Sequence, residues 1–317
     1  MADLYLKRIN YLKNSLKIAI LSYRSAPFGG GQGIYVYELS KSLKELGHQV
    51  DIISGPPYPE LIPGIKLIKL PGLNLFSTFK FGDRLDLFLN KKNKSFDDWH
   101  EFGSTLLGGF PEPQTFGNRA HSYLLDKTYD IVIDNQSISY GALKIQDSFP
   151  LVEIMHHPIS KDYYYDLKFA KGILQRISKI RWYSFLKMQK SSAKKINVVV
   201  TPSMNSKEDI HIDFQVPMEN IHVIPNGIDC DIFYPLPQIQ SKKNRLITTA
   251  SADVPLKGLD FSLEAIARLK PEYPDIHLMV IGNPRKEGHT ERLIKKLEVE
   301  NNVSFRTNLT KEEIAQE

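Results

Sequence analysis

Short apolar runs alternate with amphipathic segments along most of the chain. Residues 17–23 form an apolar run that follows a charged segment, which is typical of a buried parallel strand. After a glycine cluster, residues 34–47 predict a helix, because apolar side chains recur there at spacings of three and four: Val36, Leu39, Leu43 and Leu46. The next strand begins at residues 48–53. This order of strand, glycine loop, helix and strand predicts a βαβ unit.

Further runs of strand length continue this pattern. In the first part of the chain they lie at residues 65–70, 130–134, 151–155, 198–201 and 221–224. Residues 72–117 have weak periodicity, so we expect them to be irregular and mobile, as a candidate part of a substrate cleft. In the last part, strand-like runs alternate with helical segments such as residues 259–269; the runs lie at residues 246–251, 276–282 and 303–306. The pattern predicts two α/β domains in series.

Composition suggests where these domains meet. We assign four parts: an N-terminal extension at residues 1–16, a first domain at 17–228, a linker rich in Pro, Gln and Lys at 229–244, and a partial second domain at 245–317. Thr310 and Glu313 fit a capping box, and a helix that begins there has room for about two turns before Glu317. We therefore expect the second domain to be incomplete, with an open sheet edge.

The bulk composition is that of an ordinary globular protein. The 317 residues are 42% hydrophobic and 24% charged, enough for two domains with sizeable cores. Cys230 is the single cysteine, which excludes an internal disulfide and favours a reducing compartment. No apolar run approaches the roughly 20 residues that span a bilayer, and the first residues lack the apolar core of a signal peptide. We expect a cytoplasmic protein.

Charge is unevenly placed, because residues 161–195 carry ten Lys or Arg and two Asp. Apolar side chains recur there at helical spacing: Phe169, Ile173, Ile177 and Ile180. Such a segment can lie on an anionic membrane surface, here the inner face of the membrane. More commonly the apolar stripe packs on its own domain while the charges stay solvated. Nucleic-acid binding is disfavoured, because no recognised binding module accompanies the charge.

Two loops have the chemistry for binding an anion. Gly29-Gly-Gly-Gln-Gly33 sits between a strand and a helix, where glycines allow close backbone approach and the helix start offers free N–H groups. Its spacing is neither that of a dinucleotide fingerprint nor that of a P-loop, so a tight turn remains an alternative. Lys257 and Gly258 precede another predicted helix, where the ammonium group can lie over a bound anion or remain solvated. One such loop in each domain favours a phosphorylated ligand.

Polar residues follow two predicted strands at the edge where α/β sheets bind ligands. His156 and His157 follow residues 151–155, and Asn135 and Gln136 end the run at 130–134. Histidine can donate hydrogen bonds or exchange protons near neutral pH, but an adjacent pair is more often one buried and one exposed residue. The amides suit the hydroxyl groups of a sugar, or they cap the next helix.

Several other chemistries lack the residues they need. Asp229 and Asp231 form a D-x-D pattern, but they follow Pro225-Asn-Gly without acidic neighbours, so we expect a turn and no metal site. The chain has no H-E-x-x-H, paired-cysteine or G-x-S-x-G element, so it lacks the usual motifs of metalloproteases and serine hydrolases.

Together these motifs resemble glycosyltransferase family 4, whose members are retaining enzymes of the GT-B fold. The similar segments run in order over residues 17–317: Ser25-Ala-Pro-Phe-Gly-Gly-Gly-Gln-Gly33, Leu46-Gly-His-Gln-Val50, Val200-Thr-Pro-Ser203, Val223-Ile-Pro-Asn-Gly-Ile-Asp229, Phe233-Tyr-Pro235, Leu256-Lys-Gly-Leu-Asp260 and Leu278-Met-Val-Ile-Gly282. A bacterial subgroup is similar at Asp134-Asn-Gln-Ser137, Met155-His-His-Pro158 and Arg181-Trp-Tyr183. The fold implied is α/β, with two Rossmann-like domains and the second one incomplete.

The resemblance implies a sugar transfer from a nucleotide-diphosphate sugar to an acceptor hydroxyl, with retention and with neither metal nor cofactor. The acceptor, a sugar, lipid or polysaccharide, would lie on the first domain, the donor on the second, and the reaction in the cleft between them. His156 matches the family's histidine near the transferred sugar. Lys257 matches the basic residue at the donor diphosphate, and the leaving phosphate would help to deprotonate the acceptor. The other implied donor contacts are Gly31, Gly33, Gly258 and Gly282, and the acceptor-side candidates are Asn135, Gln136 and His157.

Two departures qualify this expectation. Ser251 stands where the family often has an arginine, and the family's E-x7-E element would lie beyond Glu317. We therefore expect the 317-residue form to be a poor catalyst. Two alternatives remain open: a non-catalytic module that binds glycan or lipid, and a dinucleotide-dependent oxidoreductase, which the glycine spacing disfavours. The nucleotide and the sugar of the donor are not determined by the sequence.

Overall fold

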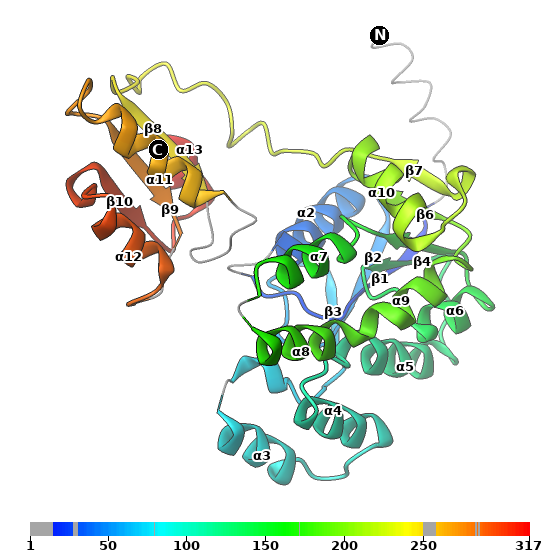
Figure 1. Cartoon of the computed structure of the whole chain (residues 1–317). Coiled ribbons are helices and arrows are strands. Elements are labelled where there is room, and N and C mark those ends of the chain that lie inside the picture. The colour runs from blue at the N-terminus through cyan, green and yellow to red at the C-terminus, as the bar shows by residue number, and fades with distance from the viewer. Residues whose placement is uncertain are drawn as a thin grey trace. The chain divides into compact units, whose positions relative to one another are not determined.

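The computed structural model describes residues 15–27, 31–78, 80–170, 172–249, 258–282, 284 and 286–317. The chain divides into two compact units, Met1–Pro225 and Asn226–Glu317 (Figure 1). Each unit is built on a parallel β-sheet flanked by helices. Lys257 lies outside the described residues, as does Ser251.

The first unit has a seven-stranded parallel sheet in the order β3-β2-β1-β4-β5-β6-β7. Its strands are β1 Lys17–Ser22, β2 Gln49–Ser54, β3 Lys66–Lys69, β4 Ile131–Asn135, β5 Leu151–Ile154, β6 Val199–Thr201 and β7 Ile221–Val223. The chain builds outward from β1 to β3 and then returns to the other side of β1 with β4. Ligands of open α/β sheets bind at such a reversal, beyond the carboxyl ends of the strands.

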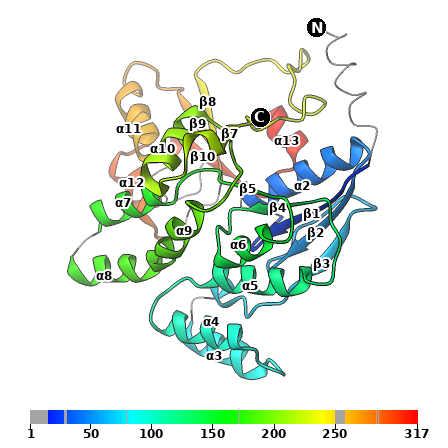
Figure 2. The ribbon, with the colours of Figure 1, turned by 90° about the vertical axis from the view of Figure 1, so that its right-hand side faces the viewer.

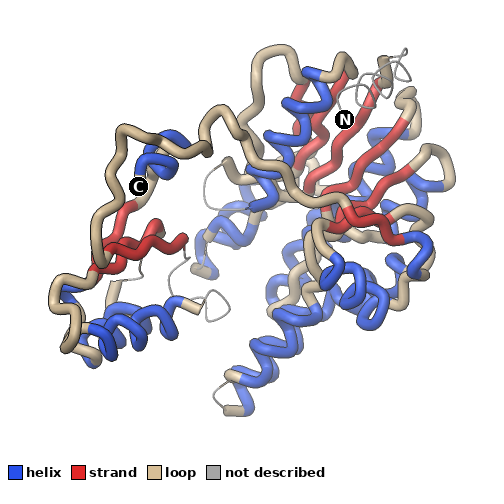
Figure 3. Tube along the Cα trace, turned by 90° about the horizontal axis from the view of Figure 1, so that it is seen from above, coloured by secondary structure: helices blue, strands red, loops and turns tan. Residues whose placement is uncertain are grey.

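Both faces of this sheet are covered, which explains why its strands are continuous apolar runs. On β1, Ala19 and Leu21 face a core that includes α5 and α6, whereas Ile18 and Ile20 face the opposite core with Val36 of α2. Seen from above, the strands lie side by side with helices on either side (Figure 3). Figure 2 shows α2 on one side of the sheet and α5 and α6 on the other. The predicted strands of this unit are thus present.

Among the described residues, the first helix of this unit is α2 Gly31–Glu45, which starts three residues earlier than we predicted. The others are α3 Phe81–Asn90, α4 Phe96–Leu106, α5 Glu112–Leu124, α6 Tyr140–Gln146, α7 Ser160–Lys168, α8 Ile173–Trp182, α9 Leu186–Ala193 and α10 Met204–Phe214. Single 3-10 turns occupy η1 Leu75–Ser77, η2 Tyr183–Phe185 and η3 Met218–Asn220.

The expectation that residues 72–117 are irregular is wrong. This segment contains α3, α4 and the start of α5. Ser95 and Asp98 form a capping box at the start of α4, a signal that was present in the sequence. The helical period was obscured because large apolar side chains such as Phe81 and Phe96 are exposed, at 60% and 84%, so that apolar residues do not mark one buried face.

The basic segment is divided among α7, α8 and α9 and has no single continuous stripe. Phe169 is the C-terminal cap of α7, and α8 starts after Gly172, whose φ is 86°. The structure records no buried residue in α8, and Ile173 and Leu174 are 74% and 81% exposed. Ile173 and Leu174 therefore do not pack into a core of their own unit, whereas Trp182 at the end of α8 stacks on Phe110 with 5.0 Å between the ring centroids.

The second unit has three parallel strands in the order β10-β9-β8. They are β8 Arg245–Thr249, β9 His277–Ile281 and β10 Val303–Arg306; the helices are α11 Leu259–Leu269, α12 His289–Lys296 and α13 Lys311–Gln316, with a 3-10 turn at η5 Glu300–Asn302. Leu263 and Val280 lie in its core. Thr310 caps α13 and Glu313 completes the predicted capping box.

Candidate active site

His156 and Asn135 are brought together at the carboxyl ends of neighbouring strands. Asn135 is the last residue of β4, and His156 follows β5, its hydrogen-bonded neighbour. The Nε2 atom of His156 lies 2.8 Å from Oδ1 of Asn135. We call this pair, with Ser22 at the end of β1, the histidine site.

A chain of short polar contacts fixes the orientation of the Asn135 amide. Its Nδ2 donates to Oγ of Ser22 at 3.4 Å, so that Oδ1 faces His156. Ser22 also accepts from Oγ of Ser25 at 2.6 Å and donates to the carbonyl of Arg24 at 3.1 Å. Asn135 and both serines are fully buried. The amide that we predicted to contact a sugar hydroxyl thus positions the histidine.

His156 is held as a neutral imidazole. Burial lowers its pKa to about 4, with a further contribution from the charge of His157. The edge of the imidazole meets the ring of Tyr35 in α2, at 4.6 Å between ring centroids. Since Oδ1 of Asn135 can only accept, Nε2 of His156 carries the proton and Nδ1 keeps a lone pair. That lone pair can accept a hydrogen bond from a ligand hydroxyl.

The turn after β4 is held in an unusual backbone conformation. Gln136 and Ile138 have φ values of 65° and 49°, in a backbone region that residues other than glycine rarely adopt. The side chain of Gln136 accepts from the backbone N–H of His156 at 3.4 Å and donates to the carbonyl of His157 at 3.2 Å. The alternative that these amides cap the next helix is wrong, because Ser139 caps α6.

Beneath the histidine site lie two buried carboxyl groups. Asp134 and Glu153 are register partners on β4 and β5, and both side chains are buried. Burial raises the pKa of Asp134 to about 6, against hydrogen bonds that include one from Ser137. Burial, and then the charge of Asp134, raise the pKa of Glu153 well above its usual range. Glu153 is accordingly the protonated member of the pair.

The two glycines of the first loop differ in their surroundings. Gly33 is buried in α2, and a Cβ there would lie 2.0 Å from the carbonyl oxygen of Ala26, so the close approach of helix and loop requires a glycine. Gly31 begins α2, and among the described residues nothing lies within 4 Å of a Cβ placed there. Packing against these residues therefore requires a glycine at position 33 but not at position 31.

The remaining predicted residues are less closely grouped. His157 is exposed and its Nε2 lies 3.0 Å from Oδ2 of Asp162, whereas His156 is half-buried, so the pair differs in exposure although neither histidine is fully buried. Gly258 caps α11 with a φ of 69°, and Gly282 follows β9 and donates to the carbonyl of Arg306 at 2.9 Å. Lys257 falls outside the described residues.

The D-x-D segment is a turn, as predicted. The backbone N–H groups of Ile232 and Phe233 donate to the carbonyl of Asp229, and the N–H of Asp231 donates to its carboxylate at 3.1 Å. In the part of the chain that the structure describes, no group of three or more His, Cys, Asp or Glu residues could hold a metal ion. No helix among the same residues is long and apolar enough to cross a membrane.

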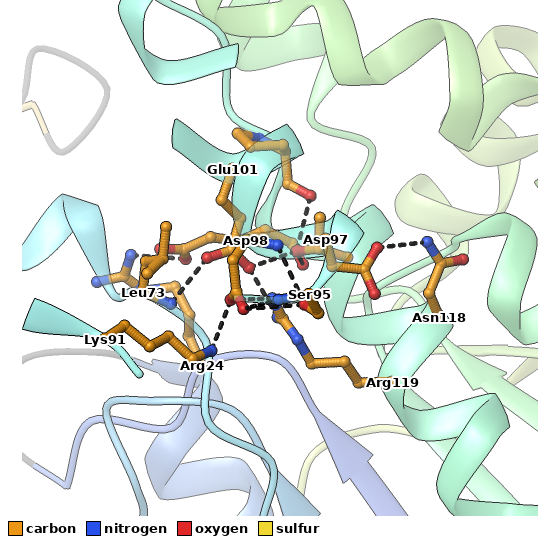
Figure 4. Close-up of polar contacts among 12 residues, drawn as sticks. Arg24, Leu73, Lys91, Ser95, Asp97, Asp98, Glu101, Asn118 and Arg119 are labelled. Atoms are coloured by element: carbon orange, nitrogen blue, oxygen red, sulfur yellow. Dashed lines mark hydrogen bonds and ion pairs between the residues drawn. The ribbon is translucent and has the colours of Figure 1, made fainter. Parts of the chain in front are cut away.

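The sequence analysis missed a second polar cluster at the same sheet edge. Figure 4 shows Arg119 between Asp98 and Glu101, with Nη2 and Nη1 at 3.2 Å and 2.7 Å from their carboxylates. Arg24 lies two residues after Ser22, the end of β1, and forms an ion pair with Glu112 at 2.9 Å. Arg24 after an apolar strand was a readable signal; the others lie in the segment that we expected to be irregular.

Comparisons with known proteins match both parts of the chain to glycosyltransferases. The model for glycosyltransferase family 4 matches residues 29–232, and the model for glycosyl transferases group 1 matches residues 237–317. The MMP alpha-(1->4)-mannosyltransferase of Mycolicibacterium hassiacum is 40% identical over 304 residues, which are 95% of this chain and 72% of that protein. A probable sucrose-phosphate synthase of Thermosipho melanesiensis is 25% identical, over 85% of this chain and 63% of that protein.

Two crystal structures share the fold. A glycosyltransferase from Rickettsia africae gives a TM-score of 0.55 at 17% identity, covering 96% of this chain and 70% of that one. The catalytic domain of starch synthase IV from Arabidopsis thaliana gives 0.56 at 16% identity, covering 96% and 76%. The fold is therefore GT-B, and the protein is an enzyme of the glycosyltransferase class. The chain belongs to glycosyltransferase family 4.

Proposed function

We propose that this chain transfers a mannosyl group from a nucleotide-diphosphate sugar to a hydroxyl group of a mannose-containing acceptor, with retention and without a metal. The main observation that supports this proposal is the neutral His156, which Asn135 holds at the ends of two neighbouring strands. The choice of mannose rests on the 40% identical mannosyltransferase. The proposal of retention has a chemical basis: activated mannose carries its phosphate on the α face, and the relative's name specifies an α linkage.

The proposed chemistry needs few protein groups. The bond from the sugar C1 to the leaving phosphate oxygen breaks, and the acceptor oxygen bonds to C1 from the same face. The acceptor proton passes to the leaving phosphate. The Nδ1 lone pair of His156 accepts a hydrogen bond from a hydroxyl of the transferred sugar and holds it in place. Lys257 and the start of α11 meet the charge that develops on the diphosphate, which replaces a metal in that role.

Product analysis tests the proposal. The chain is incubated with α-(1→4)-mannobiose and with GDP-, UDP- or ADP-mannose, with and without EDTA. Because the chain matches 72% of its mannosyltransferase relative, a form extended by the remainder of that relative is assayed in parallel. We expect a trisaccharide with a new α linkage by NMR, formed equally with EDTA. A β linkage, loss with EDTA, or no transfer by either form would contradict it.

We also propose that α8 brings the enzyme to an anionic membrane surface. Ile173, Leu174 and Ile180 are exposed on this helix, at 74%, 81% and 51%, beside cationic side chains such as Arg176 and Arg181. Exposed apolar groups flanked by positive charge complement an anionic lipid surface. Sedimentation with phosphatidylglycerol vesicles tests this: binding should fall at least tenfold in Ile173→Ser/Leu174→Ser. Unchanged binding, or equal binding to phosphatidylcholine vesicles, would contradict it.

A further inference from the structure

A small pocket lies at the carboxyl ends of β1, β2 and β3. Tyr23, Gly55 and Leu70, which follow these strands, form one side, and Glu101, Glu112 and Arg119 from α4 and α5 form the other. The pocket has about 10 Å³ of space for a water-sized group, within an empty volume of about 240 Å³ that includes open solvent. That space fits one water molecule or one hydroxyl group. We call this pocket the acidic niche.

Two buried oxygens that line the acidic niche lack a hydrogen-bond donor. Among the described residues, Oε1 of Glu112 and Oδ1 of Asn74 have no partner. Glu112 is only 7% exposed, and its other oxygen is held by Arg24 at 2.9 Å. A buried polar group without a partner costs about 1–3 kcal/mol, so native proteins rarely leave one unmet. Two unmet acceptors in one pocket therefore indicate a ligand that donates.

The charges around the niche indicate that this donor is neutral. Glu101 is saturated, because it accepts from Arg119 and Thr115 at 2.7 Å and from the N–H of Leu73 at 2.8 Å. The carboxylate of Glu101 is already paired with the guanidinium group of Arg119. The carboxyl group of Glu112, whose pKa burial raises to about 7, is paired with the guanidinium group of Arg24. A cation would add an unbalanced charge, whereas a hydroxyl group would supply a donor and leave the charges balanced.

The niche is joined to the histidine site through one short segment of backbone. The carbonyl of Arg24 accepts from Ser22, which in turn accepts from the amide of Asn135. The guanidinium of the same Arg24 reaches Glu112. The niche and the histidine site therefore share the backbone that follows β1, at one edge of the sheet.

We propose that the acidic niche is an acceptor subsite that receives one hydroxyl group of the acceptor sugar, which donates to Glu112 or Asn74. This inference rests on the proposed function, because a transferase of this kind needs an acceptor at this edge of the sheet. The niche selects for the acceptor, because an analogue without that hydroxyl leaves the buried oxygens unmet. The histidine site, by contrast, contacts the sugar that is transferred.

Binding measurements on the full chain test the subsite. Isothermal titration with α-(1→4)-mannotriose gives Kd for the wild type and for Glu112→Leu and Asn74→Gly, each checked by its melting temperature. Glycine suits position 74, where φ is 52°. Asn93→Gly is the matched control, since Asn93 has a φ of 53° and is exposed. We expect both niche variants to raise Kd at least tenfold and the control to leave it unchanged.

The outcomes separate this inference from the proposed function. If the wild type and both niche variants bind the trisaccharide equally, the niche holds only water and the subsite is refuted, while mannosyl transfer remains a valid proposal. If the variants bind more weakly but the control does so equally, the effect is not specific and the subsite is likewise refuted. If the wild type neither binds the trisaccharide nor transfers mannose, both proposals fail.

Discussion

The histidine site and the acidic niche lie at the same edge of one sheet, but the chain builds them in different ways. The histidine site comes from residues at the carboxyl ends of apolar strands, since Ser22 and Asn135 end β1 and β4, and His156 lies two residues after β5. The niche depends on side chains of α4 and α5, brought to the strand ends by contacts such as that of Arg119 with Glu101. Strand ends can be read from a local pattern, whereas contacts between helices cannot.

The two regions also differ in their electrostatics. The histidine site has no ion pair: its polar groups are a neutral imidazole, an amide and hydroxyls. The niche balances buried carboxylates against guanidinium groups. Loss of a charge in the niche should therefore affect folding, whereas loss of a group in the histidine site should affect catalysis. The predictions below test that division.

The largest effect is expected from Arg119→Ala. This change leaves the buried carboxylate of Glu101 without a cation and the buried carboxylate of Asp98 with Lys91 alone, which costs about 3–5 kcal/mol of unfolding free energy. Urea unfolding of the variant and the wild type measures it. The control is Lys127→Ala, which removes an exposed ion pair with Asp126 and should cost under about 1 kcal/mol. If the two variants lost the same unfolding free energy, the buried charges of the niche would matter no more for folding than an exposed ion pair, which would contradict this account.

A smaller effect should appear in how stability depends on pH. Burial raises the pKa of Glu112 more than the positive charge of nearby Arg24 lowers it, so the pKa shifts from 4.5 to about 7. Between these values the folded chain holds a proton that the unfolded chain has released, so this group's contribution to stability falls as pH rises. The wild type should lose about 3 kcal/mol relative to Glu112→Gln from pH 4.5 to 7.5, measured by urea unfolding. A constant difference across that range would show that Glu112 is ionised throughout.

The smallest of these effects concerns the donor. Lys257→Ala should lower kcat/KM for transfer at least tenfold, about 1.4 kcal/mol of transition-state stabilisation, because the leaving diphosphate loses a counter-charge. Initial rates at low donor concentration measure it, with Lys242→Ala in the linker as a control that should change little. A kcat/KM equal to that of the wild type would remove Lys257 from the donor site.

The strand pattern was predictable because central strands such as β1 and β2 are buried on both faces and read as apolar runs. The sequence predicted that Asn135 and His156 lie at the same edge of the sheet, because the carboxyl ends of parallel strands meet there. It did not predict their direct hydrogen bond. The helices between residues 72 and 117 were missed because exposed side chains such as Phe96 hide the helical period. The niche was missed with them, since Glu112 and Arg119 acquire a partner only when α4 and α5 pack on the strand ends.

The central claim is that catalysis takes place at His156, and the adjacent histidines provide the most direct test of it. We measure kcat for His156→Ala and His157→Ala in the form that transfers mannose, with melting temperatures to show that both variants fold. His156→Ala should lower kcat about a hundredfold, as expected when a group positioned for the transition state is removed. His157→Ala, which removes an exposed side chain, should lower kcat less than threefold. Equal losses, or a His156→Ala variant that folds and transfers at the rate of the wild type, would contradict the account.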